Sequence, residues 1–170
     1  TVTGVQTCAL PIYLNGVVKK HELTREDKER DRICHVDVCN ANTGPIFMAC
    51  RYTEPLLSLM EQWKKEHAPV YDFVTEDEIG HRVWVIDGDG ETEFIKKEFG
   101  EIPSFYIADG HHRAASAVKV GLKRREEHPD YTGEEEFNYF LSVVFPEDQL
   151  TILAYNRVVK DLNGVAEKAF

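Results

Sequence analysis

The stretch FYIADGHHRAASAVKVG at residues 105–121 carries the clearest structural signal in this chain of 170 residues. Residues 105–108 are apolar and β-prone, which predicts a buried strand. A polar turn follows at residues 109–113, and the small residues of 114–121 suit a helix that packs closely on a sheet. Gly110 lets the backbone bend between them and lets a ligand approach closely. This order of strand, turn and helix predicts an α/β fold with a site at the turn.

The turn DGHHR at residues 109–113 has the chemistry of an anion site. Free N–H groups and the dipole at the start of the following helix favour a phosphate. His111 and His112 can donate ring N–H bonds, and Arg113 offers two parallel donors. A histidine pair is often structural, but a polar cluster behind a buried strand is costly to cover without a ligand. We therefore expect a phosphate site; a turn that binds only an adventitious anion is the alternative.

Further strands and helices are predicted on both sides of this stretch. Apolar or β-prone runs predict strands at residues 17–23, 46–52, 70–75, 81–86, 137–145 and 150–159. Helix-start signals and helical spacing predict helices that run from Thr24 toward Cys34, over residues 54–66 and over residues 91–99. The runs at 70–75 and 81–86 flank an acidic, glycine-containing segment, so we expect a hairpin that continues the sheet. The predicted class is α/β, in the form of an α+β mixed sheet.

The first twelve residues, TVTGVQTCALPI, differ from the rest in composition. They carry no charge, whereas eleven of the next twenty residues are charged. The segment lacks the basic start and the long apolar run of a signal peptide, and it resembles a translated sequencing adapter. We expect residues 1–12 to be non-native and residues 13–170 to form a single α/β domain. Because the first methionine is Met48, we expect this domain to be an internal fragment of a longer protein. A genuine, poorly ordered N-terminus is the alternative.

Composition and charge argue against several classes of protein. The chain is 42% hydrophobic and 29% charged, as soluble domains are, and no run is long and apolar enough to span a membrane. Lysine and arginine total 20 against 30 aspartate and glutamate, and the net charge of -10 repels nucleic acids and anionic lipid. Four cysteines without a CxxC pair are too few for a disulfide framework. We expect a cytoplasmic protein that binds neither nucleic acid nor membrane.

A second motif, KHELT at residues 20–24, becomes informative together with the DGHHR turn. A His-Glu pair that opens a helix, followed downstream by such a turn, resembles the ParB/sulfiredoxin superfamily and in particular its free-serine kinases. Four features are similar to the domain-of-unknown-function family numbered 1015: HELT, the Asp31-Arg32 pair, IADGHHR, and YNRVVKDLNG at residues 155–164. The resemblance covers nearly all of residues 13–170. It implies a ParB/sulfiredoxin-like core with an inserted helix and hairpin.

The resemblance also implies a function, namely nucleotide-dependent phosphoryl transfer to a small hydroxyl compound such as free L-serine, with ATP or ADP and Mg²⁺. Glu22 would act as the base toward the hydroxyl, and Asp109 would orient that hydroxyl or contact Mg²⁺, with His112 as the third catalytic residue. The remaining implied site residues are Gly110, His111, Arg113 and Arg157, which would bind phosphate, and His21 and Thr24, which would lie around them. A surface ion pair is the alternative for Arg157. Phosphoryl transfer needs a carboxylate near the attacking oxygen and positive charge on the phosphates, and this set supplies both.

A nucleotide-binding regulatory or DNA-partition module of the ParB kind is the alternative function. The net charge and the lack of a basic, helix-turn-helix-like stretch argue against contact with DNA. The acidic run at residues 87–91 lacks the spacing of an EF-hand, and the segment 34–39 lacks that of a zinc site, so neither predicts a metal. The implied roles require that Glu22 lie within a few ångströms of the DGHHR turn, in a concave pocket.

Overall fold

The computed structural model describes residues 3–154, 156–161 and 164. The strands of these residues are β1 (Thr3–Cys8), β2 (Val18–Lys19), β3 (Ile46–Cys50), β4 (Tyr71–Val74), β5 (Gly80–Val83), β6 (Phe105–Asp109) and β7 (Tyr139–Pro146). The helices are α1 (Ala9–Leu14), α2 (Glu26–Cys39), α3 (Glu54–Glu66), α4 (Asp89–Gly100) and α5 (His111–Glu127), and two short 3₁₀ turns are η1 (Glu136–Asn138) and η2 (Glu147–Gln149).

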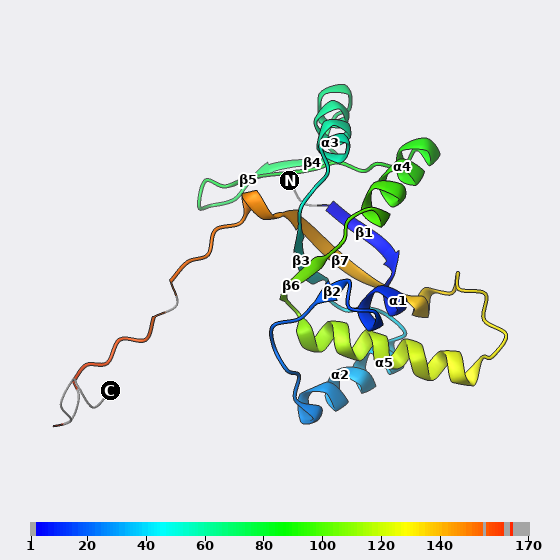
Figure 1. The fold of residues 1–170 in the computed structure, drawn as a ribbon. Coiled ribbons are helices and arrows are strands. Elements are labelled where there is room, and N and C mark those ends of the chain that lie inside the picture. The colour runs from blue at the N-terminus through cyan, green and yellow to red at the C-terminus, as the bar shows by residue number, and fades with distance from the viewer. Residues whose placement is uncertain (1–2, 155, 162–163, 165–170) are drawn as a thin grey trace.

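Five strands form one mixed sheet in the order β1-β7-β3-β6-β2 (Figure 1). The β7 strand runs antiparallel to β1 and parallel to β3, while β6 runs antiparallel to β3 and parallel to β2. This arrangement confirms the predicted α/β class with a mixed sheet. Because β6 has a neighbour on each side, the turn that follows it starts from a strand whose position is fixed by two ladders of hydrogen bonds.

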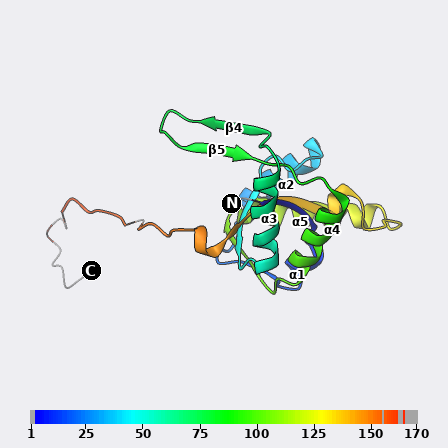
Figure 2. The same cartoon turned by 90° about the horizontal axis from the view of Figure 1, so that it is seen from above.

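Helices cover both faces of this sheet. Figures 1 and 2 show α2 and α5 on one face and α3 and α4 on the other. The buried core joins the layers, with side chains from β3, β6, β7, α3 and α5 that include Ile46, Met48, Leu56, Ile107, Val118 and Phe140. The predicted helix over residues 54–66 is confirmed, and Leu56 and Met60 of its apolar stripe are buried. No helix of the described residues has the length and apolar character needed to cross a bilayer.

The helix after the polar turn begins earlier than the small-residue pattern indicates. We expected it from residue 114, but α5 begins at His111, because Gly110 alone makes the bend with a φ of 95°. A positive φ is a conformation that glycine adopts without the steric cost of a Cβ atom. The alanines at 114, 115 and 117 are buried, which lets α5 lie close to the sheet as predicted. The histidines and Arg113 are therefore first-turn residues of α5.

The hairpin prediction is half right. Strands β4 and β5 pair antiparallel as expected, but they form a sheet of their own and do not continue the main one. All residues of both strands are exposed, and Figure 2 shows the hairpin projecting from the body. The side chains that hold its base are Trp63, which donates to the Val85 carbonyl at 3.1 Å, and Trp84, which donates to the His67 carbonyl at 3.0 Å.

Two strand predictions need correction. The run at 17–23 contributes only the two residues of β2, and α2 then starts at Glu26 without a side-chain cap. The run at 150–159 forms no strand in its described residues, 150–154 and 156–159, which lead away from the body (Figure 1). Ile152 is 98% exposed there. An apolar run becomes a strand only where a neighbouring strand accepts its backbone hydrogen bonds, and no described strand lies beside this one.

The N-terminal segment lies within the sheet, although we left it out of the expected fold. Strand β1 pairs antiparallel with β7 from Thr3 opposite Val144 to Cys8 opposite Tyr139, and α1 follows directly. Its backbone thus occupies one edge of the sheet. The adapter origin of residues 1–12 stays a prediction that direct sequencing of the gene would test.

Candidate functional site

The two sequence motifs follow two neighbouring strands. The loop that carries Glu22 comes after β2, and the DGHHR turn comes after β6. These strands are parallel, with Val18 opposite Phe105 and Lys19 opposite Tyr106. Parallel strands end at the same edge of a sheet, where loops commonly form binding sites. The pairing of β2 with β6 therefore brings together two motifs that are far apart in the sequence.

Glu22 reaches the turn, as the implied mechanism requires. Its Oε2 atom lies 3.6 Å from Nδ1 of His111, whose side chain is 3% exposed. The His21 ring packs edge-on against the His111 ring, with centroids 4.4 Å apart. The expected closeness of Glu22 to the turn is confirmed.

Arg113 folds back over the turn from which its helix starts. Its Nε donates to the Pro45 carbonyl at 3.1 Å, and one of its terminal nitrogens donates to Oδ2 of Asp109 at 3.0 Å. The guanidinium also lies against Gly110, where a Cβ atom would come within 2.9 Å of a terminal nitrogen. Arg113 thus ties the end of β6 to the loop before β3 and places a positive charge at the turn.

A pocket of about 490 Å³ opens between the turn and helix α2. Its lining consists of Glu22, Asp27, Asp31, Arg32, Asp109, Gly110, His111, His112 and Arg113. Two buried nitrogens in this lining, Nε2 of His111 and Nδ1 of His112, have no hydrogen-bond partner among the described residues. Buried polar atoms are normally satisfied, so the pocket has the concave shape and the unpartnered polar atoms of a ligand site.

Burial is the main influence on the ionisation of His111. Desolvation lowers the pKa of His111, and the neighbouring His21 lowers it further, whereas the carboxylates of Glu22 and Asp109 raise it. The net effect is downward and favours a neutral ring, in which one nitrogen donates and the other accepts. A neutral His111 can accept from or donate to a ligand without a change in net charge.

The turn fits a phosphate group better than a metal ion held by protein alone. The first backbone N–H groups of α5 have no partner within the helix, and the helix dipole favours negative charge at this end. Among the described residues, no three His, Cys, Asp or Glu side chains converge as a metal site. Mg²⁺ in phosphate sites commonly takes one or two carboxylates together with phosphate oxygens. Asp109 is the turn residue that would hold such an ion, in exchange for its bond to Arg113.

Two expected residues lie in different surroundings from those implied, and a third lies where it was expected. Arg157 is exposed in the segment beyond η2 and does not line the pocket, so its phosphate contact stays a prediction without geometric support. Thr24 donates its hydroxyl to the Glu29 carboxylate and does not cap α2. His21 contacts His111 and thereby lies beside the site, as implied.

Sequence reasoning missed part of the pocket wall on α2. Asp27 was not singled out, and it lines the pocket together with Asp31 and Arg32, which the sequence offered only as a pair shared with the family. Their spacing of four places Asp27 and Asp31 on one face of a helix, which is a usable signal. Glu29 was also missed, and it is 4% exposed. Nothing local marks it, because it stands in a run of charged residues that reads as a solvated helix face.

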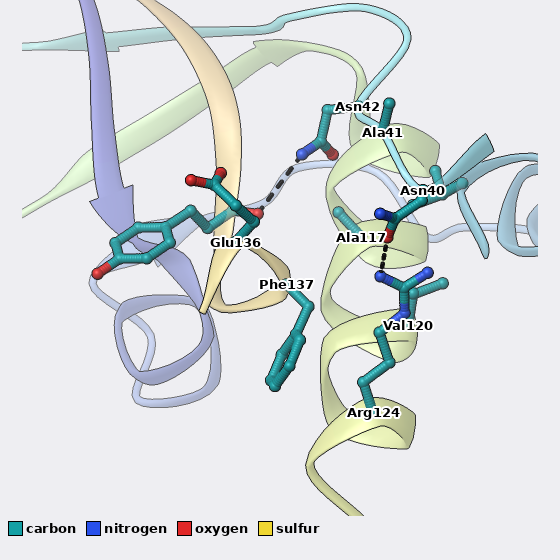
Figure 3. A pocket seen from close by; sticks show the side chains of 10 residues that line it. Asn40, Ala41, Asn42, Ala117, Val120, Arg124, Glu136 and Phe137 are labelled. Carbon is teal, nitrogen blue, oxygen red and sulfur yellow. Dashed lines mark hydrogen bonds between the residues drawn. The ribbon is translucent and has the colours of Figure 1, made fainter. Parts of the chain in front are cut away.

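A second pocket, of about 300 Å³, lies at the other end of α2, among α5, η1 and the start of β7 (Figure 3). Its polar groups are already satisfied within the protein. Arg124 donates to the Asn40 side chain and lies 3.3 Å from Asp37 Oδ1, and Asn42 donates to the Tyr139 carbonyl at 3.5 Å. This pocket therefore lacks the unpartnered ring nitrogens found beside the DGHHR turn.

Comparison with known proteins agrees with the motif pattern. A family model described as "Protein of unknown function (DUF1015)" matches residues 2–170. No curated protein and no solved structure matches the chain. Because the match spans nearly the whole chain, including HELT and IADGHHR, this chain belongs to the DUF1015 family.

Proposed function

We propose that this protein transfers a phosphoryl group from ATP or ADP to a small hydroxyl compound, with free L-serine as the first acceptor to test. The observation that carries the proposal is the position of Glu22, whose carboxylate lies 3.6 Å from His111 at a pocket that also contains the DGHHR turn. A carboxylate and a phosphate-binding turn in one pocket are the two parts that such a reaction needs.

Each group has a role in the proposed step. The Glu22 carboxylate takes the proton from the acceptor hydroxyl as that oxygen attacks the terminal phosphorus of the nucleotide. The bond from this phosphorus to the bridging oxygen breaks, and the nucleotide leaves with one phosphate fewer. His111, His112, Arg113 and the backbone N–H groups of α5 bind the phosphate oxygens and stabilise their charge. Bound Mg²⁺ would add charge neutralisation at Asp109.

Glu22→Gln is the decisive variant. We expect the purified protein, mixed with ATP or ADP, Mg²⁺ and L-serine, to form phosphoserine, detected by mass spectrometry. The amide cannot accept the proton, so turnover should fall by roughly 100-fold or more, in the range of general-base catalysis, while nucleotide affinity is retained. Glu26→Gln is the matched control, because Glu26 is exposed on α2 and does not line the pocket; it should keep full turnover.

Other outcomes discriminate between the candidate functions. Nucleotide binding without transfer to any hydroxyl compound would contradict the kinase proposal and favour a ParB-like regulatory module. Absence of nucleotide binding in calorimetry would contradict both and leave a turn that takes only adventitious anions. Unchanged turnover in Glu22→Gln would overturn the role of Glu22.

A further inference from the structure

A buried carboxylate, Glu29 of α2, has no role in the proposed reaction. It is 4% exposed, which is unusual for a glutamate. Burial of a carboxylate is costly unless hydrogen bonds and an opposite charge compensate for it. Glu29 is compensated in this way, and its two carboxylate oxygens bind groups from two different elements.

One oxygen binds the loop that carries Glu22. Oε1 of Glu29 accepts the hydroxyl of Thr24, which lies two residues after Glu22. Residues 20–25 belong to no helix or strand, and Leu23 in their middle is 94% exposed. The loop therefore gains little from apolar burial, and the bond from Thr24 ties it to α2 close to Glu22.

The other oxygen binds the helix that begins with the two histidines. Oε2 of Glu29 forms an ion pair with Lys119 of α5, and the Glu29 carbonyl accepts the Ser116 hydroxyl at 3.5 Å. Lys119 and Thr24 are the largest causes of a lowered Glu29 pKa, and the charge of His112 contributes in the same direction. Glu29 thus remains ionised between the loop and α5, with His112 nearby.

We propose that Glu29 is a positioning residue that joins the Glu22 loop to helix α5, so that the Glu22 carboxylate is held beside the DGHHR turn. This inference rests on the proposed function, in which the distance between Glu22 and the bound phosphate determines the rate. A base displaced by about 1 Å can cost on the order of 100-fold in rate. The Glu29 side chain bonds Thr24 and Lys119, and it acts on Glu22 through these two residues.

The test separates positioning from a general loss of stability. Thr24→Val removes the loop contact and leaves the ion pair with Lys119. Glu29→Gln keeps an oxygen for Thr24 and removes the charge. The matched control is Lys123→Met, which breaks the ion pair of Lys123 with Asp37, 2.5 Å long, between the same two helices but away from the loop.

We expect Thr24→Val to lower kcat by roughly 10- to 100-fold with an unchanged KM for the nucleotide. Glu29→Gln should lower kcat less, and Lys123→Met should leave it unchanged. In a Glu22→Gln background, Thr24→Val should have no further effect, because the group that it positions is already lost. A full further loss in that background, or normal turnover in Thr24→Val, would overturn the inference.

Hydrogen exchange tests the contact between Thr24 and Glu29 without any measurement of enzymatic activity. In Thr24→Val, the amides of residues 20–25 should exchange faster while those of α2 and α5 keep their protection. If the wild-type protein transfers phosphate to no acceptor, the proposed function fails, and exchange alone decides whether Glu29 holds the loop. Unchanged exchange at residues 20–25, or equal loss of protection across α2 and α5, would contradict the positioning role.

Discussion

At the residue scale, Gly110 makes the geometry of the turn possible. Its φ of 95° is strained for any residue with a Cβ atom, and an added Cβ would lie 2.9 Å from the Arg113 guanidinium. A substitution there acts in two ways, because it strains the backbone and displaces the side chain that bonds Asp109 and Pro45. The site therefore depends on one residue that contributes no functional group.

Gly110→Ala should lower the free energy of unfolding by about 1–2 kcal/mol, the cost of a left-handed conformation in an L-residue. It should also weaken the binding of ATP, because Arg113 must move. Gly133→Ala is the matched control, since Gly133 has a φ of 103° and an added Cβ would meet no atom within 4 Å. Urea denaturation and calorimetry check the two effects. Equal ATP affinity in both variants would refute the steric argument.

At the element scale, the hairpin β4–β5 is held differently from the main sheet. A two-stranded hairpin is marginally stable by itself in water. The hairpin has its own ladder and a Phe73–His81 stack with centroids 5.1 Å apart, but its strands bury no side chain. The indole bonds of Trp63 and Trp84 anchor only its base.

Native-state hydrogen exchange should therefore be much faster in the hairpin than in the main sheet. Amides at residues 72–82 should exchange with opening free energies near zero, while those of β3 and β6 should approach the global value. Trp63→Phe replaces the indole with a smaller aromatic ring and removes the donor to Val85, so it should speed exchange at the base of the hairpin and leave β3 unchanged. Equal protection of the hairpin and β3 would show that another surface covers it.

At the scale of the whole molecule, the free energy of unfolding should depend on pH through two buried groups near the candidate site, His111 and Glu29. The pKa of His111 lies below its ordinary value of 6.5, and that of Glu29 lies below 4.5. In both cases the unfolded chain takes up the proton at a higher pH than the folded chain. Acidification therefore favours unfolding, first below pH 6.5 through His111 and then below pH 4.5 through Glu29.

The expected result is a free energy of unfolding that falls steadily as the pH drops from 7 through these two windows, measured by urea denaturation. His111→Asn removes the first titration and should flatten the curve between pH 6.5 and 4.5. His35→Asn, at an exposed position on α2, should leave the slope intact. Constant stability across the first window in the wild-type protein would contradict the buried, neutral state of His111.

Local sequence determined the elements that depend on neighbouring residues alone. The apolar run at residues 46–50, the apolar stripe of α3 and the small residues of α5 could be read because propensity and spacing act over a few residues. Residues 150–159 show the limit of this reasoning. Their apolar run predicts a strand, but whether a strand forms depends on a partner elsewhere in the chain.

The sequence by itself supplied the side chains of the candidate site, since HELT and DGHHR contain the proposed base Glu22, the groups proposed to bind phosphate, and a glycine that can adopt a positive φ. Only the tertiary structure decided which groups meet. The parallel pairing of β2 with β6 puts Glu22 beside His111. The packing of α2 on α5 buries Glu29 and pairs it with Lys119, although in the sequence Glu29 is one of several charged residues of α2. Such contacts join residues that are remote in sequence. No local pattern encodes which strands become neighbours or which charged side chains are buried away from solvent.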